Sequence, residues 1–314
     1  MLLSRLVYAV LSLLAVSVLV FAATQALPGN AAVARLGVAA SPQAVAAFEQ
    51  QFHLDDPIMA QYLRWLAGLL HGQLGVSFST GMSVESMISD QVVNSLVLLI
   101  ATALIGMPLA VAIGAFTAVR MNRGFDHTSS VVMLVISALP EFVVGIGLVA
   151  LLATQVFALL PAVSPLNPNL SVFSQWDLLV LPTLTLIVIS VPYVALTVRA
   201  CMAEVLASDY VTMARLKGML ESRVILRHAL PNIAGPTFQV IAQSLAYLAG
   251  GIIVVEAVFQ YPGVGLAFFS AVASRDIPVV QALGVLLAAF YIVVNLAADI
   301  GTELMTPTMR AGAR

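Results

Sequence analysis

Six stretches of this chain are apolar over the length that a helix needs to cross a lipid bilayer. As a helix, about 20 predominantly apolar residues span a hydrocarbon core of roughly 30 Å. Apolar residues make up 61% of the 314 residues and charged residues only 9%, whereas soluble proteins contain roughly half and about a quarter. The sequence therefore predicts an all-α integral membrane protein with six transmembrane helices. They are expected at residues 6–27, 95–119, 131–160, 178–198, 236–258 and 279–300.

The first apolar stretch could instead be a secretory signal, because Arg5 precedes it and small residues end it at Ala22 to Ala26. The apolar region of such a signal is only about 7 to 15 residues long. The stretch in this chain is longer. We therefore expect residues 1–27 to be retained as the first transmembrane helix.

Lysine and arginine are unevenly distributed among the predicted loops, and in membrane proteins they accumulate on the cytoplasmic side of short loops. If the N-terminus is cytoplasmic, ten of the 13 Lys and Arg residues fall on the cytoplasmic side. Arg35 and Arg64 fall outside, in a loop at 28–94 that is slightly too long for the rule to apply firmly. We expect both termini to be cytoplasmic. Residues 95–310 should form a five-helix core that includes a cytoplasmic loop at 199–235.

The predicted extracytoplasmic loop carries two helix-start signals. Ser41-Pro42 and Asp56-Pro57 each place a capping residue before a proline, which is favoured at the first position of a helix. We expect two short helices in this insert. The second helix has one apolar face, which could lie on the membrane surface, on the other spans or against an external partner. That face contains Ile58, Tyr62, Trp65, Leu66 and Leu69.

Patterns for catalysis, metal binding and nucleic-acid binding are missing from the sequence. The single cysteine, Cys201, cannot form an internal disulfide, and the four histidines form no HExxH pair. There is no phosphate-binding loop of the form GxxxxGK[ST]. The formal charge of −2 provides no basic surface for nucleic-acid phosphates. We expect no catalytic, cofactor-binding or metal-binding residue in this chain and no nucleic-acid partner.

A few polar or helix-bending residues interrupt the predicted spans. Carboxylates at membrane depth are costly and tend to face a cavity or a partner helix. Proline removes a backbone donor and can bend a span. Glu141, Pro192 and Glu256 are therefore candidates for a translocation path or gate. Helix pairing or an interfacial position explains each of them equally well.

Residues 208–232 concentrate cations in a chain that has few. Arg215, Lys217, Arg223 and Arg227 lie there, and Arg199 stands just before. Capping by Ser208 and Asp209 predicts a short helix from Tyr210 to a left-handed Gly218, and a second helix from near Ser222 that stops before Pro231. A plain loop could hold these cations for topology alone. The capped helices and their apolar residues instead favour a docking element for a partner.

The spacing Ala214-x3-Gly218-x9-His228-x-Leu230-Pro231 resembles the coupling loop of bacterial ABC importer permeases. The form "DYVTMARLKG…RHALPN" is similar to the dipeptide/oligopeptide/nickel branch, and further segments look like the first permease subunit of that branch. These segments are "LPGN" (27–30), "LDDP" (54–57), "YLRWL" (62–66), "GQLGVSF" (72–78), "ALPEF" (138–142), "VVEAVFQYPGVG" (254–265), "RDIPVVQ" (275–281) and "NLAAD" (295–299). Asn30 and Gln73 depart from the family, which usually has Asp at both positions.

The resemblance implies a subunit of an ATP-driven importer in the bacterial cytoplasmic membrane. Its partners would be a second homologous permease, two ABC ATPase modules that bind ATP and Mg, and an extracytoplasmic substrate-binding protein. The cargo would be small peptides, or else a nickel chelate, haem or another small solute. The residues expected to couple to the ATPase are Asp209, Tyr210, Ala214, Arg215, Lys217, Gly218, His228 and Pro231.

Two other functions fit the sequence less well. A secondary transporter would need ion-relay groups in the spans and often has internal repeats, but ionisable residues are few and no repeat is visible. An intramembrane protease would need a motif such as HExxH, GxSxG or a pair of aspartates within the spans, and none occurs.

Overall fold

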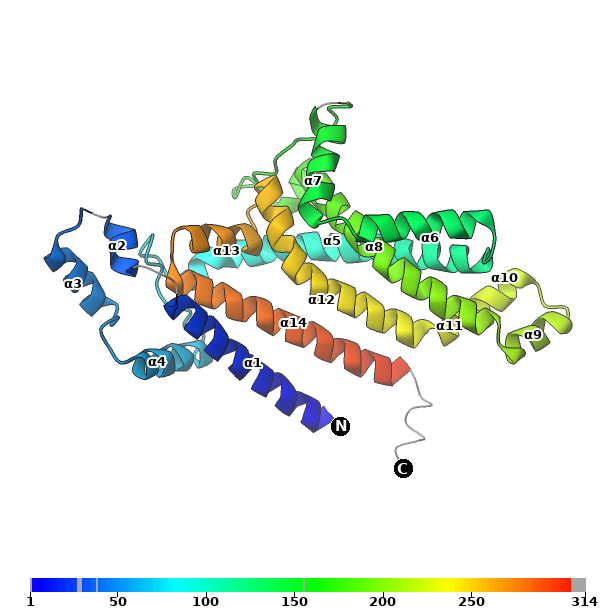
Figure 1. The fold of residues 1–314 in the computed structure, drawn as a ribbon, viewed down its shortest axis with the longest axis horizontal. Helices are drawn as coiled ribbons and strands as arrows, with labels where there is room; N and C mark the ends of the chain where they lie inside the picture. Colours follow the sequence, from blue (N-terminus) through cyan, green and yellow to red (C-terminus); the bar gives the residue numbers. More distant parts are fainter. Residues whose placement is uncertain (1, 27–29, 38, 155, 306–314) are drawn as a thin grey trace. The chain divides into compact units, whose positions relative to one another are not determined.

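The computed structural model describes the chain except residues 1, 27–29, 38, 155 and 306–314 (Figure 1). In the described residues, five helices are long and apolar enough to cross a membrane, or six if one bent pair is a single span. This agrees with the predicted all-α membrane protein. The five long helices are α1 (Leu2–Gln25), α5 (Val84–Val119), α8 (Trp176–Leu206), α12 (Ala234–Phe259) and α14 (Ile277–Met305).

The remaining helical elements are shorter. They are α2 (Ala31–Leu36), α3 (Pro42–Gln51), α4 (Ile58–Leu70), α6 (Gly124–Ser137), α7 (Glu141–Val149), a π-helical turn at Ala150–Thr154, a 3-10 turn at Val172–Gln175, α9 (Asp209–Leu216), α10 (Glu221–Val224), a π-helical turn at Ile225–Ala229, α11 (Leu230–Asn232) and α13 (Val264–Ala273). The chain divides into two compact units. Unit 1 comprises Met1–Ser95 and Pro262–Ile292, and unit 2 comprises Leu96–Tyr261 and Val293–Arg314.

The third predicted span, 131–160, is not one straight helix. It is replaced by α6 and α7, which run in different directions (Figure 1) and meet at an angle of 101°. The break falls at Pro140, which has no backbone N–H and disfavours a helical conformation at the preceding residue. The helix therefore stops before Pro140 and restarts at Glu141.

In unit 1, the insert between α1 and α5 packs on the first long helix. The ring of Phe21 in α1 lies 5.3 Å from that of Tyr62 and 5.7 Å from that of Trp65, both in α4. The hydroxyl groups of Ser17 and Tyr62 are 2.9 Å apart. The sequence predicts that the apolar face of α4 lies on the membrane surface, on another span or against a partner. In the structure it packs on another span, α1.

The two predicted helix starts in the insert behave differently. Ser41 caps α3, because its hydroxyl accepts a hydrogen bond from the N–H of Ala44 at 3.2 Å. Asp56 does not cap α4, which begins one residue later than expected, after Pro57 in an extended conformation. The Asp56 carboxylate instead pairs with Arg64, and the hydrogen bond from the guanidinium holds the pKa of Asp56 below its usual value.

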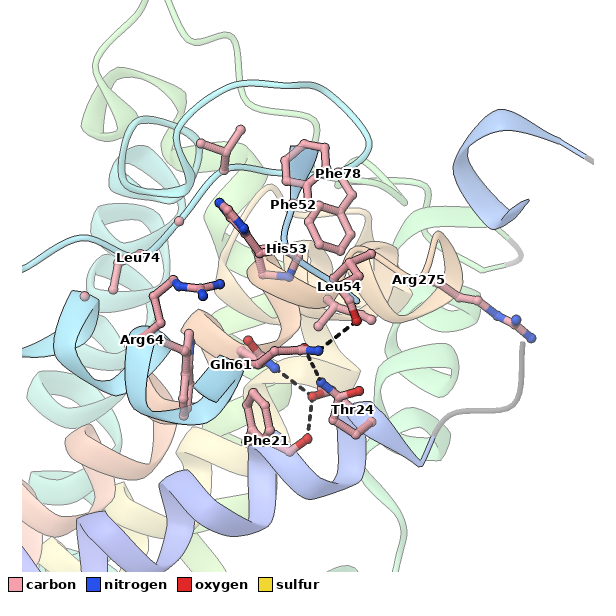
Figure 2. Close-up of a pocket in the computed structure, with 18 of the residues that line it drawn as sticks. Phe21, Thr24, Phe52, His53, Leu54, Gln61, Arg64, Leu74, Phe78 and Arg275 are labelled. Carbon is pink, nitrogen blue, oxygen red and sulfur yellow. Dashed lines mark hydrogen bonds between the residues drawn. The ribbon is translucent and has the colours of Figure 1, made fainter. Parts of the chain in front are cut away.

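Amide side chains fasten the insert to the rest of unit 1 around a cavity of about 580 Å³. Figure 2 shows the amide of Gln61 directed at the carbonyl of Leu54, to which it donates at 2.8 Å. The Thr24 hydroxyl accepts from the amide of Gln281 in α14 and donates to the carbonyl of Phe21, both at 2.8 Å. The side-chain amide of Gln25 at the end of α1 donates to the side-chain carbonyl of Gln61 at 3.1 Å. Together with the bond between Gln281 and Thr24, it joins α1, α4 and α14 within unit 1.

A buried carboxylate organises the turn that precedes α14. Asp276 is 2% exposed. It accepts hydrogen bonds from the hydroxyls of Ser77 and Ser79, both at 2.5 Å, and from the backbone N–H groups of Phe78 at 2.9 Å and Ser79 at 3.1 Å. A buried charge must be matched by polar partners. The segments "GQLGVSF" and "RDIPVVQ" therefore meet at this carboxylate, although they are about 200 residues apart.

Small residues allow close helix packing in unit 2. Gly106, Ala110 and Gly114 follow each other at steps of four residues in α5, and Ala110 is fully buried. A Cβ atom added to Gly114 would lie 2.5 Å from the carbonyl oxygen of Ala195 and 2.8 Å from Cβ of Val198, both in α8. The glycine is thus required for the approach of α5 to α8.

Asp276→Asn should destabilise unit 1, because an amide has one acceptor oxygen and turns an NH2 group toward hydrogen-bond donors. We expect a loss of about 1–3 kcal/mol and faster proteolytic cleavage within residues 77–80. Unfolding and limited proteolysis of the detergent-solubilised chain measure both effects. Asp90→Asn, at an exposed carboxylate in α5, is the control, and equal effects of the two substitutions would refute this role of Asp276.

Gly114→Ala should destabilise unit 2 by about 1–3 kcal/mol, because the added methyl group overlaps atoms of α8. Gly147→Ala is the matched control, since a Cβ at Gly147 meets no atom within 4 Å. Chemical unfolding of the two variants in detergent compares them. A Gly114 variant as stable as the Gly147 variant would contradict this packing.

Candidate functional site

The short helix α9 lies beyond the C-terminal end of α8 (Figure 1). It begins at Asp209, one residue before the predicted start at Tyr210, and Asp209 is exposed. Ser208 occupies the N-cap position but makes no capping bond. Its hydroxyl donates to the carbonyl of Val205 at 2.5 Å, so it closes the last turn of α8 instead. The predicted side-chain cap from Ser208 is therefore wrong.

The two faces of α9 have different surroundings. Val211 is fully buried and Ala214 is 7% exposed, and both pack in the main hydrophobic core of unit 2. A small residue at position 214 lets the helix lie close to that core. The opposite face exposes apolar side chains: Tyr210 is 44%, Met213 54% and Leu216 77% exposed. An exposed apolar patch of this kind is typical of an interaction surface.

Gly218 ends α9 as the sequence predicts. Its φ of +79° is in the left-handed region that favours glycine. The N–H of Gly218 donates to the carbonyl of Arg215 at 2.9 Å, and the N–H of Met219 donates to that of Ala214 at 3.3 Å. These two bonds form a Schellman motif, which satisfies carbonyl groups that the helix end leaves free. The bend after α9 therefore has a fixed geometry.

Arg215 is exposed and makes hydrogen bonds within the chain. Its guanidinium makes two hydrogen bonds with Glu221, at 2.6 and 3.1 Å, and a third with the carbonyl of Leu206 at 3.2 Å. It thus connects the end of α8 with α9 and α10. The hydrogen bond with Arg215 lowers the pKa of Glu221, and the same bond raises the pKa of Arg215. Glu221 was not predictable from the sequence, because a pair across a left-handed bend follows no helical spacing.

The helical path after the bend does not stop before Pro231, which corrects the prediction. It begins at Glu221, passes through the π-helical turn Ile225–Ala229 and continues as α11, in which Pro231 occupies one of the first two positions. Proline is tolerated there because it lacks an N–H that would be unpaired anyway. The side-chain amide of Asn232 donates to the carbonyl of His228 at 2.6 Å, and His228 is half-buried.

The cations near this segment fall into two groups. Arg199 in α8 and Arg215 are bound internally, since Arg199 donates to the carboxylate of the buried Asp126 at 2.7 Å. In the described part of the chain, no ion pair involves Lys217, Arg223 or Arg227, and all three are exposed. The segment therefore exposes three cations and the apolar face of α9.

The three residues proposed for a path or gate are placed differently. Glu141, at the start of α7, is half-buried, and its carboxylate accepts a hydrogen bond from the hydroxyl of Tyr247 in α12 at 3.0 Å. Glu256 is 0% exposed, and Pro192 is buried inside α8. Of the three, only Glu141 reaches the surface of unit 2.

Comparison with known proteins gives concordant matches over nearly the whole chain. The family described as "Binding-protein-dependent transport system inner membrane component" matches residues 110–311, and the family of the corresponding N-terminal region matches residues 1–99. Three relatives each align over 98% of both chains. They are a probable peptide ABC transporter permease protein of Sinorhizobium fredii (30% identical), a glutathione transport system permease protein of Salmonella paratyphi A (32%) and a putative peptide permease protein of Brucella suis (33%).

Glu221→Gln should loosen the bend, because the amide cannot form the ion pair with Arg215. The pair is largely exposed, so we expect a loss of at most about 1 kcal/mol, seen as faster hydrogen exchange of the α9 amides. Because folding lowers the pKa of Glu221, the ion pair stabilises the bend fully above the ordinary pKa of a glutamate, and this stabilisation is lost as the pH falls through the lowered pKa.

Hydrogen exchange of the full chain at several pH values measures this effect. The wild type should lose protection only in the acidic range, whereas Glu221→Gln should be insensitive to pH there. Glu204→Gln, at an exposed carboxylate in α8, should behave as the wild type. Unchanged protection in Glu221→Gln at neutral pH would contradict the role of the pair.

Proposed function

The chain belongs to the family of binding-protein-dependent transport system inner membrane components and is a multi-pass permease component of an ABC importer, and within that role we propose that it translocates small peptides. The support for this substrate class comes from the names of three relatives. Two of the relatives are named peptide permeases and a third is named for glutathione, which is itself a tripeptide. Small peptides are the substrate class that all three names share.

We further propose that the α9 segment faces the cytoplasm and seats on an ATPase subunit. The uneven distribution of Lys and Arg supports this orientation, with both termini on the same side as α9. The single observation that carries the proposal is the pair of faces of α9. One face is fixed in the core through Val211 and Ala214, and the other presents Tyr210, Met213 and Leu216 to the outside.

A short helix of this kind fits a groove on a partner, where its apolar side chains lose contact with water. Four further residues of the segment belong to the proposed docking element: Asp209 at the start of α9, Lys217 at its end, and His228 and Pro231 further along the chain. Because the bond from Arg215 to the carbonyl of Leu206 and the buried Val211 and Ala214 hold α9 to the end of α8, a displacement of α9 would be passed to that long helix. This is how ATP-driven closure of the ATPase subunits would move the permease.

The complete importer would contain a second homologous permease, two ATPase modules and an extracytoplasmic binding protein. Binding of ATP and Mg and hydrolysis would belong to the ATPase modules, and this chain would contribute transport alone. The insert at 28–94 would lie on the extracytoplasmic side, where the binding protein delivers substrate.

Leu216→Glu should weaken association with the ATPase subunits by at least about tenfold, because it places a charge in the centre of an apolar contact. Copurification and titration of the purified subunits measure this affinity. Leu170→Glu is the control, since Leu170 is also exposed, at 54%, but lies in the loop before α8. Equal affinities for the two variants would refute docking through α9.

Gly218→Pro should uncouple ATP hydrolysis from uptake, because proline cannot adopt the φ of +79° and has no N–H to donate to Arg215. Gly218→Asn should retain coupling, since asparagine tolerates the left-handed region. Reconstituted complexes report both activities. Coupling at the wild-type level in the proline variant would exclude the bend as part of the lever.

A further inference from the structure

One face of α12 is exposed and carries two polar side chains beside a glycine, although the helix is apolar enough to cross a membrane. Gln243, Tyr247 and Gly250 follow at steps of four and three residues, so they lie on the same side of the helix. All three are exposed, and Tyr247 is 63% exposed. We call Gln243, Tyr247 and Gly250 the polar stripe. It extends along about 10 Å of helix.

A polar stripe on a membrane helix cannot face lipid without cost, because hydrocarbon offers no hydrogen-bond partners. In the described part of the chain, no hydrogen bond satisfies the amide of Gln243. One turn earlier, the carbonyl of the Gln239 side chain accepts a hydrogen bond from the hydroxyl of Thr302 at 2.9 Å. The carbonyl of Gln239 thus has a hydrogen-bond partner within unit 2. The polar stripe beyond it therefore needs water or a polar ligand.

The break between α6 and α7 brings a carboxylate to this stripe. Glu141 is the first residue of α7, and its carboxylate accepts from the Tyr247 hydroxyl at 3.0 Å. It lies over Gly251, where an added Cβ would be 3.5 Å from the carboxylate oxygen. No ion pair involves Glu141 among the residues that the structure describes. The stripe thus ends beside an anion that has a hydroxyl donor but no cation.

We propose that the polar stripe lines the translocation path and that the Glu141 carboxylate receives the ammonium group of a substrate. The amide of Gln243 and the hydroxyl of Tyr247 would bind the amide groups that follow that ammonium. This inference deepens the proposed function and rests on it, because a peptide with a free N-terminus carries this combination of groups. A carboxylate is the natural partner of an ammonium group in a site of low polarity.

Accessibility to water tests the stripe without reference to any substrate. Gln243→Cys, in a chain whose Cys201 is replaced by alanine, should react in the assembled complex with a water-soluble methanethiosulfonate reagent. Leu104→Cys is the control, since Leu104 is 71% exposed on the apolar surface of α5 and should face lipid. Reaction of the two cysteines at the same slow rate would overturn the proposal and leave the stripe as a packing surface.

The charge of the reagent tests Glu141. A cationic reagent should modify Gln243→Cys faster than an anionic reagent of the same size, and Glu141→Gln should lower this ratio of rates at least about fivefold. Asp177→Asn, at an exposed carboxylate in α8 outside the stripe, should leave the ratio unchanged. A ratio insensitive to Glu141 would overturn the assignment of the carboxylate.

Uptake by the reconstituted importer then tests the ligand. Glu141→Gln should lower uptake of alanyl-phenylalanine at least about tenfold relative to its N-acetylated form, and Glu141→Asp should restore part of the preference. An equal loss for both peptides would show a structural role and overturn the inference. A wild-type complex that takes up neither peptide would refute the proposed peptide function, whereas the labelling experiments would still decide the polar stripe.

Discussion

The need to satisfy every polar group away from water is the constraint on which this structure depends. It forces the apolar chain into helices, whose backbone groups pair internally. It surrounds the buried Asp276 with four hydrogen-bond donors and places Arg199 against Asp126. Where the constraint is not met within the chain, as on the exposed face of α12, a further partner has to meet it. Polar groups that lack partners within the chain therefore indicate a surface for water, substrate or another subunit.

The two faces of α9 also differ in whether they have partners within the chain. Packing holds one face, and the bond from Arg215 to the carbonyl of Leu206 fixes the position of α9 at the end of α8, while the N–H of Gly218 fixes the bend that follows. The short helix would be marginal alone, because nucleation of a helix is unfavourable. Rigidity therefore comes from tertiary contacts, and it leaves the apolar side chains of the other face in place for a partner. In the proposed function, this fixed geometry is what would let the segment dock on a partner.

Local signals predicted the elements that depend on neighbouring residues. The apolar runs located the long helices, Ser41 the start of α3 and the left-handed Gly218 the end of α9. Features set by distant contacts were not predictable. The spacing did not predict that Arg215 pairs with Glu221, and the 101° break at Pro140 interrupts an apolar run that the sequence predicts as one span. The fold also explains why asparagine is suited to position 30, where the family usually has aspartate. The amide of Asn30 donates a hydrogen bond to Glu49 at 2.5 Å, which an aspartate could not donate.

The central claim is that the exposed face of α9 contacts an ATPase subunit in the cytoplasm. A photo-cross-linking amino acid at Met213, which is 54% exposed, tests it in the assembled importer. The account predicts cross-links to the ATPase subunit, at the same position in intact cells and in the purified complex. Cross-links to lipid or to the extracytoplasmic binding protein would contradict both the docking role and the orientation of the chain.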